Sequence, residues 1–463
     1  MKKYGLILLF CAVSLLGFAQ PNVIIVFVDD LGYNDLSCYN STAIETPNLD
    51  LMAQEGILFK DFYVASSICS PSRAALLTGK YPPHSGVTQV YFPDRAGMSK
   101  DNYLISQHLK NSGYRTACFG KWHLGDLKGH LPTDRAFDEY FGIPFSNDMF
   151  IGASHKFHEE VIFREGYDME MAKRDQENVK IHYKNRKELK KIGIKEKVPL
   201  FEGDKIIEYP CDQASLTQRY FQRTMDFMEA KSNQPFFIYL TPAMPHVPLF
   251  ASNEFLGSGG KGLYPNVVEE IDHYMGELQA KIEDLGIAEN TILIFTSDNG
   301  PWLGMKDHAG SAAPLRDGKF TLYEGGFRVP CIMKWKGKWP AGVETNAIFS
   351  SIDFFPTIAH YAGNPLTDDT IDGKDYHQFL ERPEEGKART SFFYHKGDAF
   401  LGVRENDWKY LPYGGGRKVK EGEGTPELYH LKTDTGEQEN LSSQHLELQI
   451  QFGQRLEMEN STL

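Results

Sequence analysis

The chain has 463 residues and a formal net charge of −13, with 41% hydrophobic and 24% charged residues. This composition is typical of a globular protein with a large core and a smaller second unit, and it excludes a collagenous or disordered chain. The acidic excess argues against nucleic acid as a partner and gives no long-range attraction for a polyanion. An anionic substrate would therefore need local cations in a pocket.

The N-terminus has the pattern of a signal peptide. Two lysines precede an apolar run over residues 5–18, and Gly17 and Ala19 are small residues that suit a cleavage site. The run is shorter than the about 20 residues that a membrane span needs, and Cys11 lies inside it, away from a lipidation position. We expect residues 1–19 to be removed, and the protein to be exported to the periplasm or the medium without a stable membrane anchor.

Five cysteines would remain after this cleavage, at positions 38, 69, 118, 211 and 331. They are scattered along the chain without a CxxC pair. An exported protein of this size can hold one or two disulfides, but an odd number of cysteines leaves one thiol over. We expect Cys69 to be that thiol.

Strand and helix patterns alternate along most of the chain. Continuous runs of β-branched and aromatic residues predict strands at 22–28, 114–119, 236–240 and 291–296. Other segments predict helices at 47–55 (with Thr46 as N-cap and Pro47 first), 101–112, 214–231 and 268–285. The alternation predicts an α/β sandwich around a large, mostly parallel sheet over residues 20–373.

The pattern changes after Gly373. Short antiparallel strands at 391–394, 399–411 and 427–431 and a helix at 443–457 predict a smaller C-terminal α+β unit over residues 374–463. Residues 151–208 are rich in lysine and glutamate with weak periodicity. We therefore expect that stretch to be an excursion from the sheet, outside the core.

Two of the predicted strands end in acidic and amide residues. Asp29 and Asp30 follow the first strand, and Asp298 and Asn299 follow the strand at 291–296. Ligands of open α/β sheets bind at the carboxyl ends of strands. Oxygen ligands suit a hard divalent cation such as calcium or magnesium, although each pair taken alone is also explained as a turn cap.

Cys69 lies just ahead of a predicted helix. Pro71 suits the first helical position and Gly79 suits the end of the helix. The helix N-terminus, with Arg73 one turn in, would favour a thiolate or another anion at position 69. A small buried cysteine beside a helix cap is the structural alternative.

The same segment resembles a signature of the type I, formylglycine-dependent sulfatases, in particular arylsulfatase A-like and bacterial polysaccharide sulfatases. Residues 69–73 (CSPSR), followed by LTG, match C-x-P-S-R, and residues 113–123 (GYRTACFGKWH) match the second family signature. Further matches follow in family order: PNVIIVFVDDLGYNDL, TPNLD, PHVP, SDNG, GK followed by EGG, and DWKY. The resemblance covers nearly the whole mature chain and implies an alkaline-phosphatase-like sandwich with a C-terminal subdomain.

Carried over residue by residue, the resemblance implies a calcium site and a sulfate site. Calcium would be held by Asp29, Asp30, Cys69, Asp298 and Asn299. A formylglycine-generating or equivalent maturation enzyme would first oxidise Cys69 to formylglycine. The other residues of the site would be Arg73, which stabilises the formylglycine, with Lys121, His123, Ser146, His246 and Lys319.

The implied chemistry assigns roles to these side chains. A hydroxyl of the hydrated aldehyde would attack sulfur, while calcium, Lys121 and Lys319 neutralise the sulfuryl oxygens. His246 would protonate the leaving oxygen, with Lys319 as the second choice, and His123 would take the proton whose loss expels sulfate. Taken singly, such a lysine is usually solvated surface and such a histidine only shapes a turn.

The expected substrate is an O-sulfated carbohydrate, at a chain end or in a short oligosaccharide. Fragments of glycosaminoglycans, mucin glycans or algal galactans are the candidates. Specificity is expected in residues 146–212 and 413–417, both outside the family motifs. Two alternatives stay open: a phosphodiesterase or phosphonate hydrolase on the same scaffold, and a non-catalytic glycan-binding relative.

Overall fold

The computed structural model describes residues 20–230, 232, 234–257, 262–367 and 371–463. The expected signal peptide lies outside these residues. Within them, no helix is both long and apolar enough to cross a membrane.

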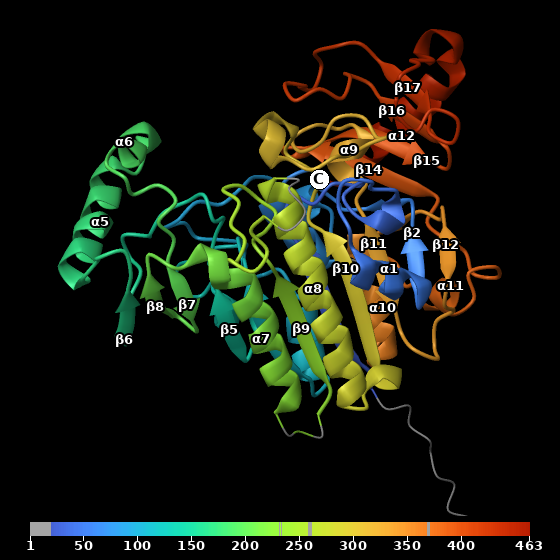
Figure 1. The fold of residues 1–463 in the computed structure, drawn as a ribbon. Coiled ribbons are helices and arrows are strands. Elements are labelled where there is room, and N and C mark those ends of the chain that lie inside the picture. The colour runs from blue at the N-terminus through green and yellow to red at the C-terminus, as the bar shows by residue number, and fades with distance from the viewer. Residues whose placement is uncertain (1–19, 231, 233, 258–261, 368–370) are drawn as a thin grey trace, which may run out of the picture.

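An 11-stranded sheet forms the centre of the molecule (Figure 1), in the order β12-β2-β11-β10-β1-β9-β4-β5-β7-β8-β6. In chain order its strands are β1 (Asn22–Val28), β2 (Ile57–Phe59), β4 (Arg115–Gly120), β5 (Glu139–Gly142), β6 (Phe157–Phe163), β7 (Leu200–Glu202), β8 (Lys205–Tyr209), β9 (Phe236–Thr241), β10 (Thr291–Ser297), β11 (Cys331–Lys334) and β12 (Val343–Thr345). The central strands β10, β1, β9, β4 and β5 are parallel, and β11 is antiparallel to β10 and β2. The predicted large, mostly parallel sheet is confirmed.

Both faces of the sheet are covered by helices. Ile24 and Val26 face one apolar core with α1, α7 and α8, while Ile25 and Phe27 face another with α2, α4 and α10. This double burial explains why β1 is apolar at every position. The helices of this part are α1 (Pro47–Gln54), α2 (Cys69–Thr78), α3 (Pro82–Ser85), α4 (Ile105–Asn111), α7 (Leu216–Glu229), α8 (Leu263–Asp284), α9 (Glu324–Phe327), α10 (Phe354–Tyr361) and α11 (His377–Glu381). A short pair, β3 (Phe62–Tyr63) with β13 (Phe349–Ser350), stands apart from the main sheet.

Helix α2 begins at Cys69, two residues earlier than predicted, so Pro71 is its third residue. Proline is tolerated there because the first N–H groups of a helix have no partner within the helix. Gly79 ends α2 with φ 67°, as predicted. At α1, Thr46 precedes Pro47 as expected, but its hydroxyl accepts a hydrogen bond from the Ser37 N–H (2.9 Å) and does not cap the helix.

Residues 151–208 are part of the sheet and the core, and the prediction that they lie outside both is wrong. Strands β7, β8 and β6 extend the main sheet beyond β5, and Val179, Leu189, Phe201 and Ile206 are buried in one of its two cores. β7 and β8 have only three and five residues, and β6 and β8 carry polar and apolar residues on both sides, so the sequence shows no clear alternation. Helices α5 (Met169–His182) and α6 (Arg186–Lys191) form an arm at the left of Figure 1.

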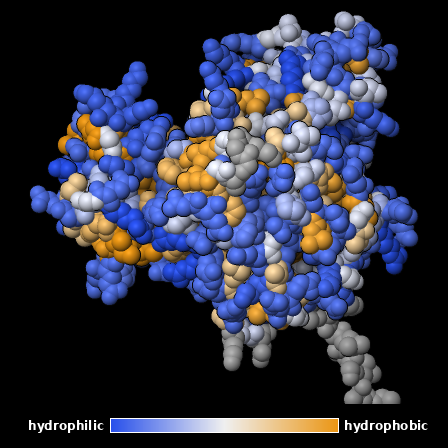
Figure 2. All heavy atoms as spheres, in the orientation of Figure 1, coloured by the Kyte–Doolittle hydropathy of each residue, from blue (hydrophilic) through white to orange (hydrophobic). Residues whose placement is uncertain are grey.

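A separate four-stranded antiparallel sheet forms the C-terminal unit, in the order β14-β15-β16-β17. Its elements are β14 (Ser391–Lys396), β15 (Ala399–Glu405), β16 (Trp408–Leu411), β17 (Glu427–His430) and α12 (Leu446–Asn460), which contributes Phe452 and Leu456 to a third core. The single strand predicted at 399–411 is two strands joined by a tight turn, in which Asn406 has φ 52°. In Figure 2 the surface is hollowed between the α5–α6 arm and this unit, and most of this face is hydrophilic.

All five cysteines of the described chain are free thiols. Cys69 is a free thiol as expected, but it is not the single thiol left over, because the other four cysteines are also unpaired. Cys118, Cys211 and Cys331 are buried in the apolar cores, where cysteine packs as a small hydrophobic side chain.

Candidate active site

The site lies at the carboxyl ends of β1 and β10. These strands are parallel neighbours, with Val28 opposite Ser297, so the residues that follow them meet at one edge of the sheet. Ligand atoms of Asp29, Asp30, Cys69 and Asp298 all lie within 4.8 Å of one another. The acidic cluster expected from the two strand ends is therefore formed.

Three oxygen atoms of this cluster have no hydrogen-bond partner among the described residues. They are Asp29 Oδ1, Asp30 Oδ2 and Asn299 Oδ1. The three residues are at most 3% exposed, and buried oxygens without a partner are costly. A hard divalent cation would satisfy all three, and an all-oxygen set of carboxylates with one amide suits calcium or magnesium.

Asp30 is held in an uncommon backbone conformation. Its φ is 65°, in the left-handed region that non-glycine residues seldom adopt. The Asp30 N–H donates to Asp298 Oδ1 (3.2 Å), and the Asn299 amide donates to Asp30 Oδ1 (2.6 Å). These bonds link the two strand ends and fix the direction of the Asp30 carboxylate.

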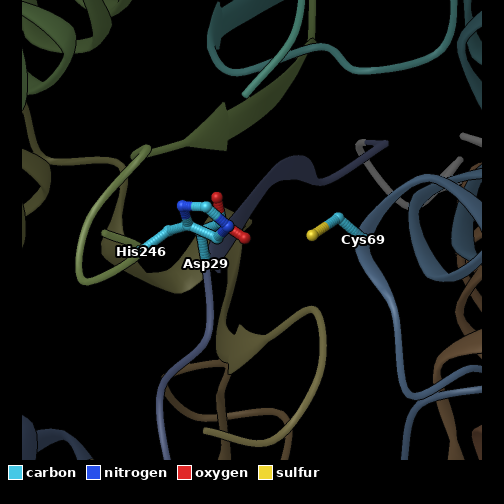
Figure 3. Close-up of side chains that lie close together, drawn as sticks. All are labelled: Asp29, Cys69 and His246. Carbon is cyan, nitrogen blue, oxygen red and sulfur yellow. The ribbon is translucent and has the colours of Figure 1, made fainter. Parts of the chain in front are cut away.

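Cys69 faces this cluster from the first turn of α2. Its Sγ points toward Asp29 and His246 in Figure 3. Burial raises the pKa of the Cys69 thiol to about 12, although Lys121 and Lys319 act in the opposite direction. For the thiol, loss of solvent outweighs the nearby positive charges, which were expected to favour a thiolate or another anion at this position. The thiol itself is a poor nucleophile at neutral pH.

Two lysines supply positive charge beside Cys69. Lys319 Nζ donates to Asp30 Oδ1 (2.5 Å) and to Cys69 Sγ (3.2 Å). Lys121 Nζ donates to Asp29 and lies 3.5 Å from Ser146 Oγ. Burial opposes the charge of Lys319, but Asp30 and Cys69 raise its pKa above the ordinary lysine value. Both ammonium groups are buried next to carboxylates, which provides the local cations that the acidic chain requires.

Arg73, four residues after Cys69 in α2, contacts the acidic cluster. Its Nε donates to Asp298 Oδ2 (2.9 Å), a second guanidinium nitrogen lies 2.8 Å from the same oxygen, and Nη1 donates to the carbonyl of Lys121 (2.9 Å). The side chain is fully buried. Arg73 thus fixes Asp298 and the end of β4 directly.

His246 presents one ring nitrogen to the site. Its Nδ1 lies 2.6 Å from the Val247 carbonyl and 3.1 Å from Asn147 Oδ1. A carbonyl only accepts hydrogen bonds, so Nδ1 carries the proton and Nε2, 3.7 Å from Asp30 Oδ2, is the nitrogen free to act. Burial and Lys319 lower the pKa of His246.

His123 follows Lys121 by two residues in the chain and is also buried. Its Nε2 bonds the Tyr91 carbonyl (3.0 Å), and its buried Nδ1 has no partner among the described residues. Burial and Lys121 hold its pKa well below the usual histidine value. Because a carbonyl only accepts hydrogen bonds, Nε2 carries the proton of the neutral ring, and Nδ1 is the nitrogen whose lone pair is unused.

The structure brings the site residues predicted from the sequence into one buried cluster, and it adds two that sequence reasoning missed. Asn147 orients His246, and Trp302 lies with its ring centroid 5.9 Å from that of His246. Their only signals were adjacency to the motifs, since Asn147 follows Ser146 and Trp302 follows SDNGP.

Comparisons with known proteins agree with this site. A family model described as Sulfatase matches residues 21–364, and one described as N-sulphoglucosamine sulphohydrolase, C-terminal, matches residues 316–462. Mouse arylsulfatase G is 34% identical over 431 residues, covering 89% of this chain and 79% of its own length. Dog N-acetylgalactosamine-6-sulfatase is 35% identical over 409 residues, covering 84% and 71%.

Solved structures show the same relationship. The crystal structure of Ps i-CgsB in complex with k-i-k-neocarrahexaose has a TM-score of 0.75 at 29% identity, over 95% of this chain and 93% of that one. Three findings indicate the same family. The Sulfatase model covers most of the chain, relatives are more than 30% identical to it, and the fold is the alkaline-phosphatase-like fold of the solved sulfatases. The chain belongs to the type I sulfatase family and is a sulfuric ester hydrolase.

Proposed function

We propose that this enzyme hydrolyses O-sulfate esters of a carbohydrate, using Cys69 in its formylglycine form and a calcium ion. The observation that carries the proposal is the meeting of three unpaired buried oxygens with two ammonium groups around Cys69. The names of relatives support the sugar part: one is an N-acetylgalactosamine-6-sulfatase, and Ps i-CgsB holds a neocarrahexaose. The net charge of −13 favours a short oligosaccharide or a chain end over a long polyanion.

Asp29, Asp30, Asp298 and Asn299 are the residues that would hold the calcium ion, together with residue 69. When bound, this ion supplies positive charge that stabilises anionic oxygens of the nucleophile and the sulfate. Formylglycine supplies a hydrated aldehyde, with one hydroxyl to attack sulfur and a second that permits release of the product. The first turn of α2 places residue 69 where free backbone N–H groups favour an anion.

Lys121 and Lys319 would bind the sulfuryl oxygens from two sides. Lys319 Nζ is already 3.2 Å from the Cys69 side chain, and Lys121 is placed by Asp29. Because both ammonium groups are fixed before substrate arrives, they stabilise the charge of the transition state without reorganisation.

We assign the proton transfers to His246, His123 and Lys319. His246 Nε2 faces the site while its Nδ1 proton is fixed, so a second proton on Nε2 would pass to the leaving oxygen. Lys319 is the alternative donor. His123, held neutral by burial, would accept the proton whose removal releases sulfate.

Four measurements test the proposal. Mass spectrometry of the peptide that contains Cys69 should show the aldehyde, and turnover of nitrophenyl sulfate should disappear after exhaustive chelation and return with calcium. Nitrophenyl sulfate should be hydrolysed faster than a nitrophenyl phosphodiester, since the reverse order would indicate a phosphodiesterase. A panel of sulfated oligosaccharides, a steroid sulfate and choline sulfate tests the sugar assignment, which a preference for either non-sugar ester would overturn.

A further inference from the structure

Two aromatic side chains line the site beside Lys319. The ring centroids of Trp302 and Phe320 are 5.4 Å apart, and Lys319 Nζ lies 5.4 Å and 5.7 Å from them. The same Nζ is 3.2 Å from Cys69 Sγ, and Trp302 also packs against His246. The two rings therefore border the place where the sulfated group of a substrate would sit.

Trp302 has the properties of a ligand contact. It is partly exposed, and its indole N–H has no acceptor among the described residues. Trp122, Trp335 and Trp339 differ, because their N–H groups donate to a carbonyl or hydroxyl at 2.8–3.0 Å. Trp408 is also partly exposed without an acceptor among the described residues, but it packs against His430 and His445 of the C-terminal unit and not beside Lys319. A partly exposed indole with a free donor suits a sugar, which offers a C–H face for stacking and hydroxyls for hydrogen bonding.

Arg417, which belongs to the C-terminal unit, lies against one of these two rings. Its guanidinium lies 4.4 Å from the centroid of the Phe320 ring and is exposed. Lys396 Nζ holds the loop in place, because it donates to the carbonyls of Phe320 (3.4 Å), Gly416 (3.4 Å) and Arg417. The Lys396 side chain thus links the backbone of Phe320 to that of Arg417.

Arg417 and Lys396 form a pair of basic groups without an acidic partner. Within the described chain, neither side chain makes an ion pair with a carboxylate. Burial and the nearby Arg417 charge lower the pKa of Lys396, which agrees with like charges in close proximity. In a chain of net charge −13, a basic pair without a carboxylate partner beside Phe320, the residue that follows Lys319, points to an anionic ligand.

We propose that Trp302, Phe320 and Arg417 form a saccharide subsite in which Arg417 binds a second acidic group of the substrate. Trp302 and Phe320 contact the sugar, and Arg417 pairs with a sulfate or carboxylate that is not hydrolysed. The preferred substrate is then a sugar sulfate that carries a further sulfate or lies next to a uronic acid. The inference rests on the proposed function and names its substrate class.

The test compares Arg417→Gln with two control variants of the full-length, converted enzyme. The substrates are nitrophenyl sulfate, N-acetylgalactosamine 6-sulfate, its 4,6-disulfate, and a disaccharide with a uronic acid next to the 6-sulfated sugar. Loss of a charge-assisted pair should lower kcat/KM for a doubly acidic sugar roughly tenfold more than for the singly sulfated ones. Comparison of the disulfate with the disaccharide identifies the acidic group.

The two controls show whether the effect is specific to position 417 or follows from the loss of any positive charge on the surface. Arg382 directly follows α11, is largely exposed and pairs with Glu385, so Arg382→Gln removes one positive charge and should leave all four rates unchanged. Arg95 lies over Tyr183 in a surface pocket with Lys180, beside the α5–α6 arm. A selective loss in Arg95→Gln, or an equal loss on every substrate in Arg417→Gln, would overturn the proposal.

Binding measurements separate this inference from the proposed function. In a Cys69→Ala background, calorimetry should show that Arg417→Gln weakens binding of the 4,6-disulfate roughly tenfold, whether or not the wild-type cysteine is converted. Trp302→Ala should weaken it further, while Trp302→Phe retains part of the stacking. Unaltered binding in these variants refutes the subsite, whereas absence of turnover of the sugar sulfates by converted wild type refutes only the proposed function. Thermal unfolding of each variant identifies any loss due to misfolding.

Discussion

At the scale of single residues, Asp298 has two functions that a substitution cannot separate. It belongs to the acidic cluster, and it is the principal partner of the fully buried Arg73. Asp298→Ala should therefore abolish activity and also lower the free energy of unfolding by about 3–5 kcal/mol, because the Arg73 charge is left without its partner. Urea denaturation measures the second effect.

Asn299→Ala is the matched variant for Asp298→Ala. Its amide oxygen has no partner among the described residues, and its amide nitrogen donates to Asp30 Oδ1 (2.6 Å) and to the Gly300 carbonyl (2.9 Å). Removal should cost activity and calcium affinity, with a smaller loss of stability than in Asp298→Ala, because hydrogen bonds are lost but no buried charge is left without its partner. Equal stability of Asp298→Ala and wild type would show that the Arg73 contact contributes little.

His246 allows a prediction about selectivity. If its Nε2 protonates the leaving oxygen, His246→Ala should reduce hydrolysis of alkyl sulfates at least tenfold more than hydrolysis of nitrophenyl sulfate, because a nitrophenolate leaves without a proton. Steady-state kinetics on both substrate classes measures this. Equal losses would transfer the role to Lys319, whose ammonium group already lies next to Cys69.

At the scale of elements, the loop after β10 and the turn of α9 are in backbone contact. The Gly300 N–H donates to the Gly326 carbonyl (3.1 Å), and a Cβ on Gly300 would lie 1.7 Å from the Gly325 carbonyl oxygen. Gly300→Ala should force the two segments apart, which displaces Asn299 and Lys319 in opposite directions. We expect at least a tenfold loss of kcat/KM and about 1–3 kcal/mol of destabilisation.

Gly337→Ala serves as the control for Gly300→Ala. Gly337 lies in a turn where an added Cβ meets nothing within 4 Å, although its φ of 73° also strains an alanine. Activity should survive in that variant. An active Gly300→Ala enzyme would mean that the two loops adjust independently.

The elements also show what sequence reasoning can and cannot reach. β1 and the acidic residues after it were predictable, because a strand buried on both faces has a continuous apolar pattern and its end is marked by Asp29 and Asp30. The free state of the cysteines was not, since it depends on distances between distant residues. Trp302, Phe320 and Arg417 lie up to 115 positions apart and meet only through packing of the C-terminal unit against the loop that follows Lys319.

At the scale of the whole molecule, a buried ion cluster joins the C-terminal unit to the catalytic part. Lys409 of β16 lies 2.9 Å from Glu324 Oε1 and 2.7 Å from Glu437 Oε1, and all three side chains are fully buried. Glu324 begins α9, which follows the Lys319 segment. The C-terminal sheet thereby supports the loop that carries Lys319, for which we propose a catalytic role.

This cluster gives stability a defined pH dependence. Burial and the nearby Glu324 raise the pKa of Glu437 to about 7, above the ordinary value of 4.5. Between those values the folded state holds a proton that the unfolded state releases, so the contribution of Glu437 to stability falls as pH rises from about 4.5 to 7. Glu437→Gln should show a smaller loss of Tm between pH 5 and pH 7.5 than wild type. An identical pH dependence in both proteins would contradict the raised pKa.

The strands of residues 151–208 have a consequence for the solubility of the protein. β7, β8 and β6 cover the free edge of β5, whose residues 140–142 are buried. The outermost strand, β6, carries exposed glutamates at 159 and 160, and charges on an edge strand oppose pairing with another molecule. A chain shortened here to change its substrate range would expose an apolar, hydrogen-bonding edge at β5. Such a chain would be prone to form intermolecular sheets, so this segment protects the enzyme from aggregation as well as bordering its surface hollow.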